Sequence, residues 1–270
     1  MKQILWFLAL LTACGLVVGA HGFQEKLSAT EIINKHLAAV GGKEALSKIK
    51  TRAALGTVKR ENQAEVPVVF ASEAPDRFSA VYSFQDSAWR LIYDKGKQAF
   101  RPSFTREYSV VEDKYKEMLA SGFFTNGIAL YNALLAEPGP DAKLEAKGTK
   151  KVNGQPAYVI EYKRDKKSNV FKLLFDTENF MWVRTEFGRV TIPQQIGAFT
   201  NDVQSKSDEQ PTADFYVETS DFREVDGLKL PHKLTQVVTF PVLRQRPVGT
   251  LTVTINEYKH NVQIDPKLFQ

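Results

Sequence analysis

The period of apolar and polar residues changes several times along the chain, and each change marks a boundary. Residues 1–20 are a mostly apolar run that follows one positive charge, Lys2, and ends in Val18-Gly19-Ala20. A basic start, an apolar centre and small residues at the end are typical of a signal peptide. The sequence therefore predicts export, with cleavage after Ala20 and a mature domain over residues 21–270.

A second processing site stays open in the same run. Leu11-Thr12-Ala13-Cys14-Gly15 fits the bacterial lipobox, in which residues 1–13 are the signal and Cys14 is lipidated. Lipoproteins usually continue into a polar tether, whereas Gly15-Leu16-Val17-Val18 is apolar, so we favour cleavage after Ala20. The first site predicts a protein of the periplasm, and the second predicts one anchored to the outer membrane through Cys14. Both are proteins of the cell envelope.

Helical spacing is clearest at the start of the mature domain. Ser28-Ala29-Thr30-Glu31 is a capping box, in which the serine hydroxyl accepts from a backbone amide and the glutamate reaches back to the serine amide. The apolar residues that follow recur at helical spacing: Ile32, Ile33, Leu37 and Val40. Gly41-Gly42 ends this helix, and Lys43–Ile49 predicts a short second one. An amphipathic pair of this kind covers an apolar surface.

Beyond residue 51 the period changes to two, which is typical of strands with one buried face. Gly, Pro, Asn and Asp separate the alternating stretches, most clearly at Asn153-Gly154, and connections this short make neighbouring strands antiparallel. The predicted strands are Arg52–Arg60, Val66–Ser72, Arg77–Phe84, Ala88–Tyr93, Gln98–Pro102, Leu144–Val152, Ala157–Lys163, Asn169–Asp176, Phe180–Phe187, Phe215–Glu224, Leu228–Phe240 and Val248–His260.

Two stretches interrupt these strands. Glu112–Ala136 is the most apolar segment of the mature domain and favours helix, with Gly122 and Gly127 dividing it into two short helices. Asn201–Thr212 is polar and has no period, which is typical of a long loop. The whole pattern predicts one α+β domain, mostly β, in which about eleven antiparallel strands form a single large curved sheet with helices against one face.

Composition narrows this picture. Cys14 is the only cysteine, so the mature fold has no disulfide and depends on its core, for which 43% hydrophobic residues suffice. The net charge of +5 favours anionic lipid headgroups or acidic partners, but without a dense basic stripe it does not indicate nucleic acid. The basic hairpin Lys163-Arg164-Asp165-Lys166-Lys167, with Lys147, Lys150 and Lys151 expected nearby, suits either membrane phosphates or a solvated turn that discourages pairing of sheet edges.

Residues that carry catalysis or bind metals are sparse and scattered. The four histidines lie at the cleavage site, in the first helix and on two separate strands: His21, His36, His232 and His260. None of the spacings typical of zinc sites, nucleophile elbows or phosphate-binding glycine loops occurs. We therefore expect no enzymatic activity, no metal and no cofactor.

Aromatic residues crowd one face of the predicted strands. A curved sheet lined in this way has a concave side that two short helices need not fill, and an unfilled apolar concavity binds lipids or acyl chains. The alternative is that the same side chains simply pack under the helices. The candidate cavity residues are Phe78, Tyr82, Phe84, Trp89, Met118, Leu119, Phe123, Phe124, Leu134, Tyr158, Tyr162, Phe171 and Phe175.

Several short motifs occur along the chain in an order that is typical of one protein family. Two are the most specific: the hairpin Asp226-Gly227-Leu228-Lys229-Leu230-Pro231 and the closing Asn261-Val262-Gln263-Ile264-Asp265-Pro266-Lys267-Leu268-Phe269. The others are His36-Leu37-Ala38-Ala39-Val40-Gly41-Gly42, Val152-Asn153-Gly154 and Leu173-Leu174-Phe175-Asp176. Together they cover essentially the whole mature chain, which resembles the outer-membrane lipoprotein-sorting proteins of the LolA/LolB-like family, as a divergent member.

The resemblance implies a fold and a function. It implies an unclosed half-barrel with helices over its concave face, in which Glu112–Ala136 is the lid or plug. It also implies a closing arginine on an early strand, for which the sequence offers four candidates without choosing among them: Arg52, Arg60, Arg77 and Arg90. The protein is then a non-enzymatic envelope protein, monomeric and in transient contact with the membrane surface, that binds lipid or lipoprotein acyl chains for transport or sorting to the outer membrane.

The alternative function is a β-rich periplasmic interaction or sensor domain without a lipid cargo, because a fold does not fix a function. The site at which the signal peptide is cleaved distinguishes two versions of the lipid-binding function. Cleavage after Ala20 implies a shuttle of the LolA type, and lipidation at Cys14 implies a tethered acceptor more like LolB.

Overall fold

The computed structural model describes residues 27–60, 63–84, 87–94, 97–101, 117, 123–130, 141–191, 212–239 and 247–270. The predicted signal peptide, Cys14 and most of the predicted loop at Asn201–Thr212 lie outside these ranges, as do three candidate cavity residues, Met118, Leu119 and Leu134. Phe84 and Trp89 are described as strand residues only, without their side chains.

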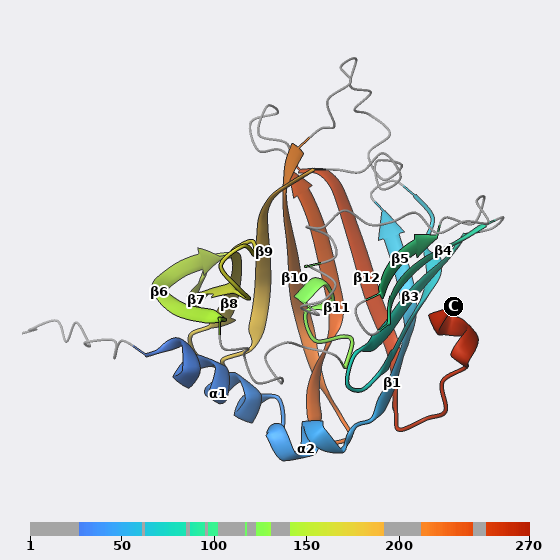
Figure 1. Cartoon of the computed structure of the whole chain (residues 1–270), viewed down its shortest axis with the longest axis horizontal. Helices are drawn as coiled ribbons and strands as arrows, with labels where there is room; N and C mark the ends of the chain where they lie inside the picture. Colours follow the sequence, from blue (N-terminus) through green and yellow to red (C-terminus); the bar gives the residue numbers. More distant parts are fainter. Residues whose placement is uncertain are drawn as a thin grey trace, which may run out of the picture.

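Twelve antiparallel strands form a single sheet (Figure 1). They are β1 (Thr51–Arg60), β2 (Val66–Glu73), β3 (Arg77–Phe84), β4 (Ser87–Asp94), β5 (Lys97–Arg101), β6 (Lys143–Val152), β7 (Gln155–Lys163), β8 (Phe171–Asp176), β9 (Trp182–Thr191), β10 (Thr212–Val225), β11 (Leu228–Thr239) and β12 (Pro247–His260). Every predicted strand is present, and the largest shift of an end is at β9, predicted to stop at Phe187 and observed to reach Thr191.

The order of the strands explains why the sheet stays open. It runs β5-β4-β3-β2-β1-β12-β11-β10-β9-β8-β7-β6, so the first and last strands of the domain pair in the middle. The two free edges are β5 and β6, which follow one another in the chain but do not pair. The sheet curves strongly between these edges (Figure 1), and the predicted unclosed half-barrel is confirmed.

Two helices lie below the sheet in Figure 1, α1 (Ala29–Ala39) and α2 (Lys43–Lys48). The capping box is formed as predicted, since the Glu31 amide donates to Ser28 Oγ over 3.3 Å and the Ser28 amide donates to Glu31 Oε2 over 2.8 Å. Gly41 ends the helix at φ +119°, and a Cβ there would lie 2.6 Å from the carbonyl oxygen of Gly227. Glycine is therefore required where α1 meets the hairpin between β10 and β11.

The pair of helices predicted over Glu112–Ala136 is only partly supported: Glu117, in the first predicted helix, is helical, whereas the prediction was wrong at residues 123–130. Phe123–Thr125 is a single 3-10 turn, η1, and turns continue to Leu130. Asn126 and Gly127 both have positive φ, 46° and 97°, which an α-helix does not accommodate. Asparagine followed by glycine is a pair that tolerates the left-handed region, so local turn chemistry outweighs the helical preference of the apolar residues around it.

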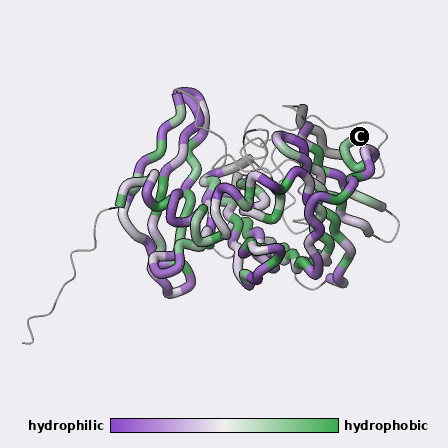
Figure 2. The backbone as a smooth tube through the Cα atoms, turned by 90° about the horizontal axis from the view of Figure 1, so that it is seen from below, coloured by the Kyte–Doolittle hydropathy of each residue, from purple (hydrophilic) through white to green (hydrophobic). Residues whose placement is uncertain are grey.

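The main core lies on the concave face. Alternation along the strands (Figure 2) places one row of side chains inside, and cross-strand register aligns these rows, as where Tyr162 faces Phe171 and Ile160 faces Leu173. The candidates Phe78, Tyr82, Tyr162, Phe171 and Phe175 all belong to this core. A smaller apolar cluster, formed by Val152, Ala157, Val159 and Leu174, lies on the other face.

The chain ends on the convex face. A short 3-10 helix, η3 (Pro266–Phe269), packs beside β3 and β4 and buries Phe269 (Figure 1). The Arg77 guanidinium lies 4.3 Å from the centre of the Phe269 ring. Arg90 Nη1 donates to the carbonyl oxygens of Lys267 and Gln270, over 3.1 and 3.4 Å.

Candidate functional site

Residues 123–130 lie across the concave face of the sheet, in front of β10 and β11 in Figure 1. We call this segment the plug. It belongs to the stretch of chain that runs between the two free edge strands, β5 and β6. Phe123 and Ile128 are fully buried, and Ala129 and Leu130 nearly so. The plug therefore fills the position that an apolar ligand of the concave face would take.

On one side, buried side chains attach the plug to β9 and β10. Asn126 Nδ2 donates to Thr219 Oγ1 over 2.7 Å, and Thr185 Oγ1 donates to Asn126 Oδ1 over 2.7 Å. The Thr219 hydroxyl in turn donates to the carbonyl oxygen of Trp182. Three buried polar groups satisfy one another, which fixes the position of Asn126.

On the other side, the plug is attached to β1 and β2. The Leu130 amide donates to Ser72 Oγ over 2.9 Å. Arg52 Nη1 donates to the carbonyl oxygens of Gly127 and Ile128, over 3.1 and 3.4 Å. The plug thus bridges the two halves of the open sheet through a small number of polar contacts, and each contact satisfies a backbone or amide group that burial would otherwise leave without a partner.

Arg52 is the most unusual residue of this site. Its exposed fraction is 2%, and no ion pair with a described carboxylate joins its guanidinium. Burial lowers the pKa of Arg52 to about 10, so the group stays protonated at neutral pH. The ring of Tyr258 lies below it, 5.9 Å from its Cζ. A cation buried without a carboxylate is energetically unfavourable unless its neighbours compensate for the lost hydration.

A histidine supplies part of that compensation. Arg52 Nε donates to His260 Nε2 over 3.0 Å, and His260 Nδ1 lies 2.8 Å from Asp226 Oδ2. Because Nε2 accepts this hydrogen bond, the histidine is neutral and carries its proton on Nδ1, which donates to the carboxylate. Desolvation and the Arg52 charge both lower the pKa of His260, and Asp226 opposes them. A chain of three residues thus connects the buried arginine to an exposed acid.

A small cavity of about 50 Å³ remains between the helices, the plug and the β10–β11 hairpin. Its lining is mostly apolar, and the charged side chains that the described part of the chain contributes are those of Arg52 and Lys229. The lining residues are His36, Leu37, Val40, Leu46, Arg52, Asn126, Gly127, Ala129, Leu130, Trp182, Phe222, Lys229, Leu230 and Pro231.

His36 anchors α1 to the same site. Its Nδ1 donates to the carbonyl oxygen of Phe180 over 2.9 Å, and its ring packs against Phe175 at 5.1 Å and against Trp182. Burial lowers the pKa of His36 to about 4 despite that hydrogen bond. His36 is therefore neutral near pH 7 and belongs to the apolar packing around the cavity.

The predicted cavity residues fall into two groups. The first surrounds Phe123, whose ring lies 5.0 Å from that of Tyr162, 6.2 Å from that of Phe171 and 5.3 Å from that of Trp182. Phe124 stacks on Phe215 at 6.0 Å beside this group.

The second group lies on β2 and β3, where Phe70 packs against Phe78 and Tyr82 at 6.2 and 6.3 Å. Tyr158 is separate from both groups. It is partly buried and stacks on Phe180 at 5.8 Å. The structure therefore places most of the described candidates on the concave face, but not around one common centre.

The polar residues that hold the plug were missed by the sequence analysis. Ser72, Thr185 and Thr219 each stand in a row of inward-facing residues that is otherwise apolar, as where Ser72 follows Val68 and Phe70 at a period of two. Such an interruption is the one signal in the sequence that indicates them. Arg52 was considered, but nothing local distinguished it from the three other early arginines.

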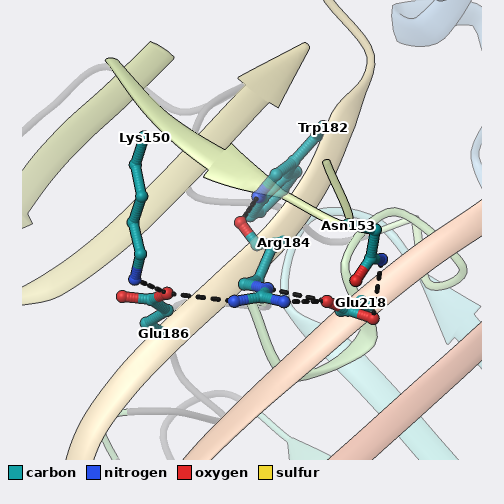
Figure 3. A network of polar contacts seen from close by, with 6 residues as sticks. All are labelled: Lys150, Asn153, Trp182, Arg184, Glu186 and Glu218. Carbon is teal, nitrogen blue, oxygen red and sulfur yellow. Dashed lines mark hydrogen bonds and ion pairs between the residues drawn. The ribbon is translucent and has the colours of Figure 1, made fainter. Parts of the chain in front are cut away.

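A contrasting polar network lies on the other face (Figure 3). Arg184 Nε donates to Glu218 over 2.8 Å, and Asn153 Nδ2 donates to the same carboxylate over 3.3 Å. Lys150 Nζ pairs with Glu186 at 2.6 Å. The network ties the β6–β7 hairpin to β9 and β10. Its groups are paired and partly solvated, which is the ordinary arrangement of surface charges.

The expected grouping of basic residues is corrected by the register of β6 and β7. Lys143 is paired with Lys163, next to the basic hairpin, whereas Lys151 faces Pro156 at the opposite end of the same two strands. Lys150 and Lys151 therefore lie away from the hairpin, and Lys147 forms ion pairs with Glu145 and Glu161 instead.

Two further searches gave negative results for the part of the chain that the structure describes. No helix there is long and apolar enough to cross a membrane. No three or more His, Cys, Asp or Glu side chains are grouped there as metal ligands.

Comparison with known proteins was informative only at the level of structure. No family model and no curated protein matches the sequence. A LolA superfamily protein from Nitrosomonas europaea superposes with a TM-score of 0.52 at 10% identity, covering 90% of this chain and 98% of that one. An outer membrane lipoprotein-sorting protein domain from Vibrio parahaemolyticus gives 0.52 at 11% identity, over 89% and 95%. The chain thus has a LolA-like fold, and the resemblance predicted from its sequence is confirmed at the level of the fold.

Proposed function

We propose that this protein binds lipid or lipoprotein acyl chains on the concave face of its sheet, after the plug has moved aside, and that it carries or sorts them in the cell envelope. The observation that supports this most directly is the plug itself. A segment that connects the two free sheet edges fills an apolar concavity, yet buried polar contacts with β1, β2, β9 and β10 hold it in place.

This mode of attachment suits a segment that is displaced. Aromatic side chains of the sheet form apolar walls on either side of the plug, as Phe171 and Phe78 do. Polar contacts give the closed position a defined geometry, and an acyl chain that replaces Phe123 and Ile128 gains about 0.8 kcal/mol for each methylene group that it buries. The exchange of plug for ligand therefore keeps the concave face covered in both states.

Arg52 is the closing arginine of this mechanism. Its guanidinium donates to two carbonyl oxygens of the plug. Arg77 and Arg90 contact η3 on the opposite face. Opening the plug breaks the two Arg52–carbonyl hydrogen bonds, and closing restores them after release of the ligand.

Export to the periplasm or cell envelope is part of the proposal, with cleavage after Ala20 giving a shuttle and lipidation of Cys14 giving an anchored acceptor. The Vibrio domain that shares the fold is described as an outer membrane lipoprotein-sorting protein, which supports this setting. The proposal involves a monomer, transient contact with the membrane surface and no enzymatic step.

Loosening the plug tests the function. Asn126→Ala removes the three side-chain hydrogen bonds that Asn126 forms with Trp182, Thr185 and Thr219 of β9 and β10. The open state then becomes more populated, and the apparent affinity for an acyl ligand rises. We expect the delipidated variant to bind a dipalmitoyl lipopeptide at least threefold more tightly than the unmodified protein, as measured by calorimetry and by native mass spectrometry. Asn153→Ala, which removes a hydrogen bond on the other face, is the matched control and leaves the affinity unchanged.

The alternative function, an interaction or sensor domain whose concave face is permanently filled, has one observation in its favour, which is the complete burial of Phe123 and Ile128. The same experiment separates the two. If Asn126→Ala only lowers the melting temperature, and neither protein binds the lipopeptide or a fatty acid, the concavity is a packed core and the carrier proposal fails.

A further inference from the structure

The small cavity beside the plug has a chemistry that the binding of an acyl chain does not explain. Its walls include Trp182, Leu130 and Phe222, which suit an apolar chain. Among the described residues, its charged lining side chains are two cations, Arg52 and Lys229, and no Asp or Glu of these residues lines it. An apolar pocket with unopposed positive charge selects an amphiphile with a negative head over a neutral one.

The guanidinium of Arg52 also has a free donor. Its Nε donates to His260 and its Nη1 donates to two plug carbonyls, but its Nη2 is buried without a hydrogen-bond partner among the described residues. Buried donors are almost always satisfied, and Arg52 is only 2% exposed. A buried cation that lines a cavity and keeps one donor unused is the arrangement expected of an anion-binding group.

We propose that this cavity binds the anionic head group, a carboxylate or a phosphate, of an amphiphilic ligand, with Arg52 Nη2 as the buried donor and Lys229 at the solvent side. The inference rests on the proposed function, since the acyl chain of the same ligand lies where the plug is now. Lys229 is an exposed residue that lines the cavity, so it meets the head group before Arg52 does.

The size of the cavity fits a head group and not a chain. A volume of about 50 Å³ holds about three or four water molecules, which is comparable to one carboxylate or phosphate group. The remainder of the ligand needs the plug to move. An anion at Arg52 Nη2 neutralises the charge of the guanidinium whose Nη1 donates to the plug carbonyls. Binding of the head group therefore weakens these hydrogen bonds and favours opening of the plug.

A matched set of probes tests the head group. Myristate, myristyl alcohol and 1-myristoyl lysophosphatidate share one chain length and differ in charge, and each is titrated calorimetrically below its critical micelle concentration into the delipidated full-length protein. We expect myristate and the lysophosphatidate to bind at least tenfold more tightly than the alcohol. Inorganic phosphate, titrated in parallel, should bind far more weakly than the lysophosphatidate, because the chain contributes most of the affinity.

Variants assign the effect to the two cations. Arg52→Met should lower the affinity for myristate to that for the alcohol, and Lys229→Met should lower it at least threefold. Arg90→Met, an arginine that contacts backbone carbonyls on the convex face, and Lys259→Met, an exposed lysine of the neighbouring strand β12, are the matched controls. Circular dichroism checks folding, and if Arg52→Met does not fold, Lys229→Met carries the test.

The outcomes distinguish this inference from the proposed function. Equal affinities for myristate and the alcohol overturn the anion site and leave acyl-chain binding intact. A preference for the anions that survives in each folded variant also overturns it, as does phosphate that binds as tightly as the lysophosphatidate. Absence of binding by every chain-bearing probe instead contradicts the proposed function itself.

Discussion

Two short irregular segments cover opposite faces of the sheet, the plug on the concave face and η3 on the convex face, and one arginine holds each in nearly the same way. Arg52 donates to two plug carbonyls over 3.1 and 3.4 Å, and Arg90 donates to two carbonyls at η3 over the same distances. The geometry of the two contacts is alike. Their surroundings differ, and the surroundings determine how much each contact contributes to stability.

Arg90 is partly exposed, and water replaces its hydrogen bonds at little energetic loss. Arg52 is buried and pairs with no carboxylate of the described residues, so its charge has no comparable replacement. The contacts of η3 are therefore ordinary surface packing. The stability of the plug contacts, in contrast, depends on the charge and the hydrogen-bond partners of Arg52. The same hydrogen-bond geometry thus occurs in partly exposed packing on one face and, in the function that we propose, holds a movable element on the other.

The largest expected difference concerns the aromatic residue at the centre of each segment. Phe123 is fully buried among the rings of Tyr162, Phe171 and Trp182, whereas Phe269 belongs to the short helix η3 and has the Arg77 guanidinium against its ring. Phe123→Ala should lower the free energy of unfolding by about 4 kcal/mol and Phe269→Ala by about 2 kcal/mol or less, measured by urea denaturation at pH 7. An equal loss in the two variants would contradict the comparison.

Acid should loosen the concave face. Burial lowers the pKa of His36 from 6.5 to about 4, and the pKa of His260 is lowered as well. Between these values the unfolded chain binds more protons than the folded one, so stability is fully present above pH 6.5 and falls as the pH decreases towards 4. His36 alone accounts for a loss of about 3 kcal/mol.

Denaturation at pH 7 and pH 4.5 measures this loss. His36→Asn retains a donor close to Nδ1 but cannot be protonated, so it should reduce the difference between the two pH values by about half or more. Protonation of His260 also removes the acceptor of Arg52 Nε, and His260→Asn should reduce the remaining difference. If both variants lose as much stability in acid as the unmodified protein, other groups carry the pH dependence.

The strands and α1 could be predicted from the sequence, but the conformation and contacts of the plug could not. The strands are predictable because the alternation of apolar and polar residues along each strand is a local pattern. The start of α1 is predictable because the capping box of its N-cap residue, Ser28, lies within four consecutive residues. The plug differs, because its conformation depends on contacts with Ser72, Thr185 and Thr219, which are distant in sequence. The helix propensity of the apolar residues in this segment contains no information about contacts with residues so distant in sequence.

The same limit applies to Arg52. Its place at the start of a strand resembles that of Arg77, and both alternate with apolar residues. The two arginines differ in the face of the sheet on which they lie, because only the face of Arg52 contacts the plug. For Arg52 this depends on the pairing of β1 with β12, some two hundred residues apart in the chain. His260 lies directly opposite Arg52 in that pairing, whereas the sequence alone identifies it only as a histidine on a separate strand.

A smaller effect is expected from the hydroxyls on which the plug depends. Thr219→Val keeps the shape of the side chain but removes the acceptor of Asn126 Nδ2, which then retains its longer hydrogen bond, 3.4 Å, to the Trp182 carbonyl oxygen. It also removes the hydroxyl that donates to this carbonyl, so the free energy of unfolding should fall by about 1–3 kcal/mol. Thr177→Val is the matched control, because its hydroxyl donates to a carbonyl oxygen at an exposed turn. Thermal and urea unfolding should show a change below about 0.5 kcal/mol for the control.

The smallest effect is predicted for the arginine of η3, and it is the one that tests the comparison most directly. Arg90→Met removes two hydrogen bonds with the same distances as those of Arg52, at a partly exposed site, so the free energy of unfolding should change by less than about 1 kcal/mol. Lipopeptide affinity, measured by calorimetry, should not change, since η3 lies on the face away from the plug. A loss of stability as large as that of Thr219→Val would show that burial is not what distinguishes the two arginines, and the special role of Arg52 would then need another explanation.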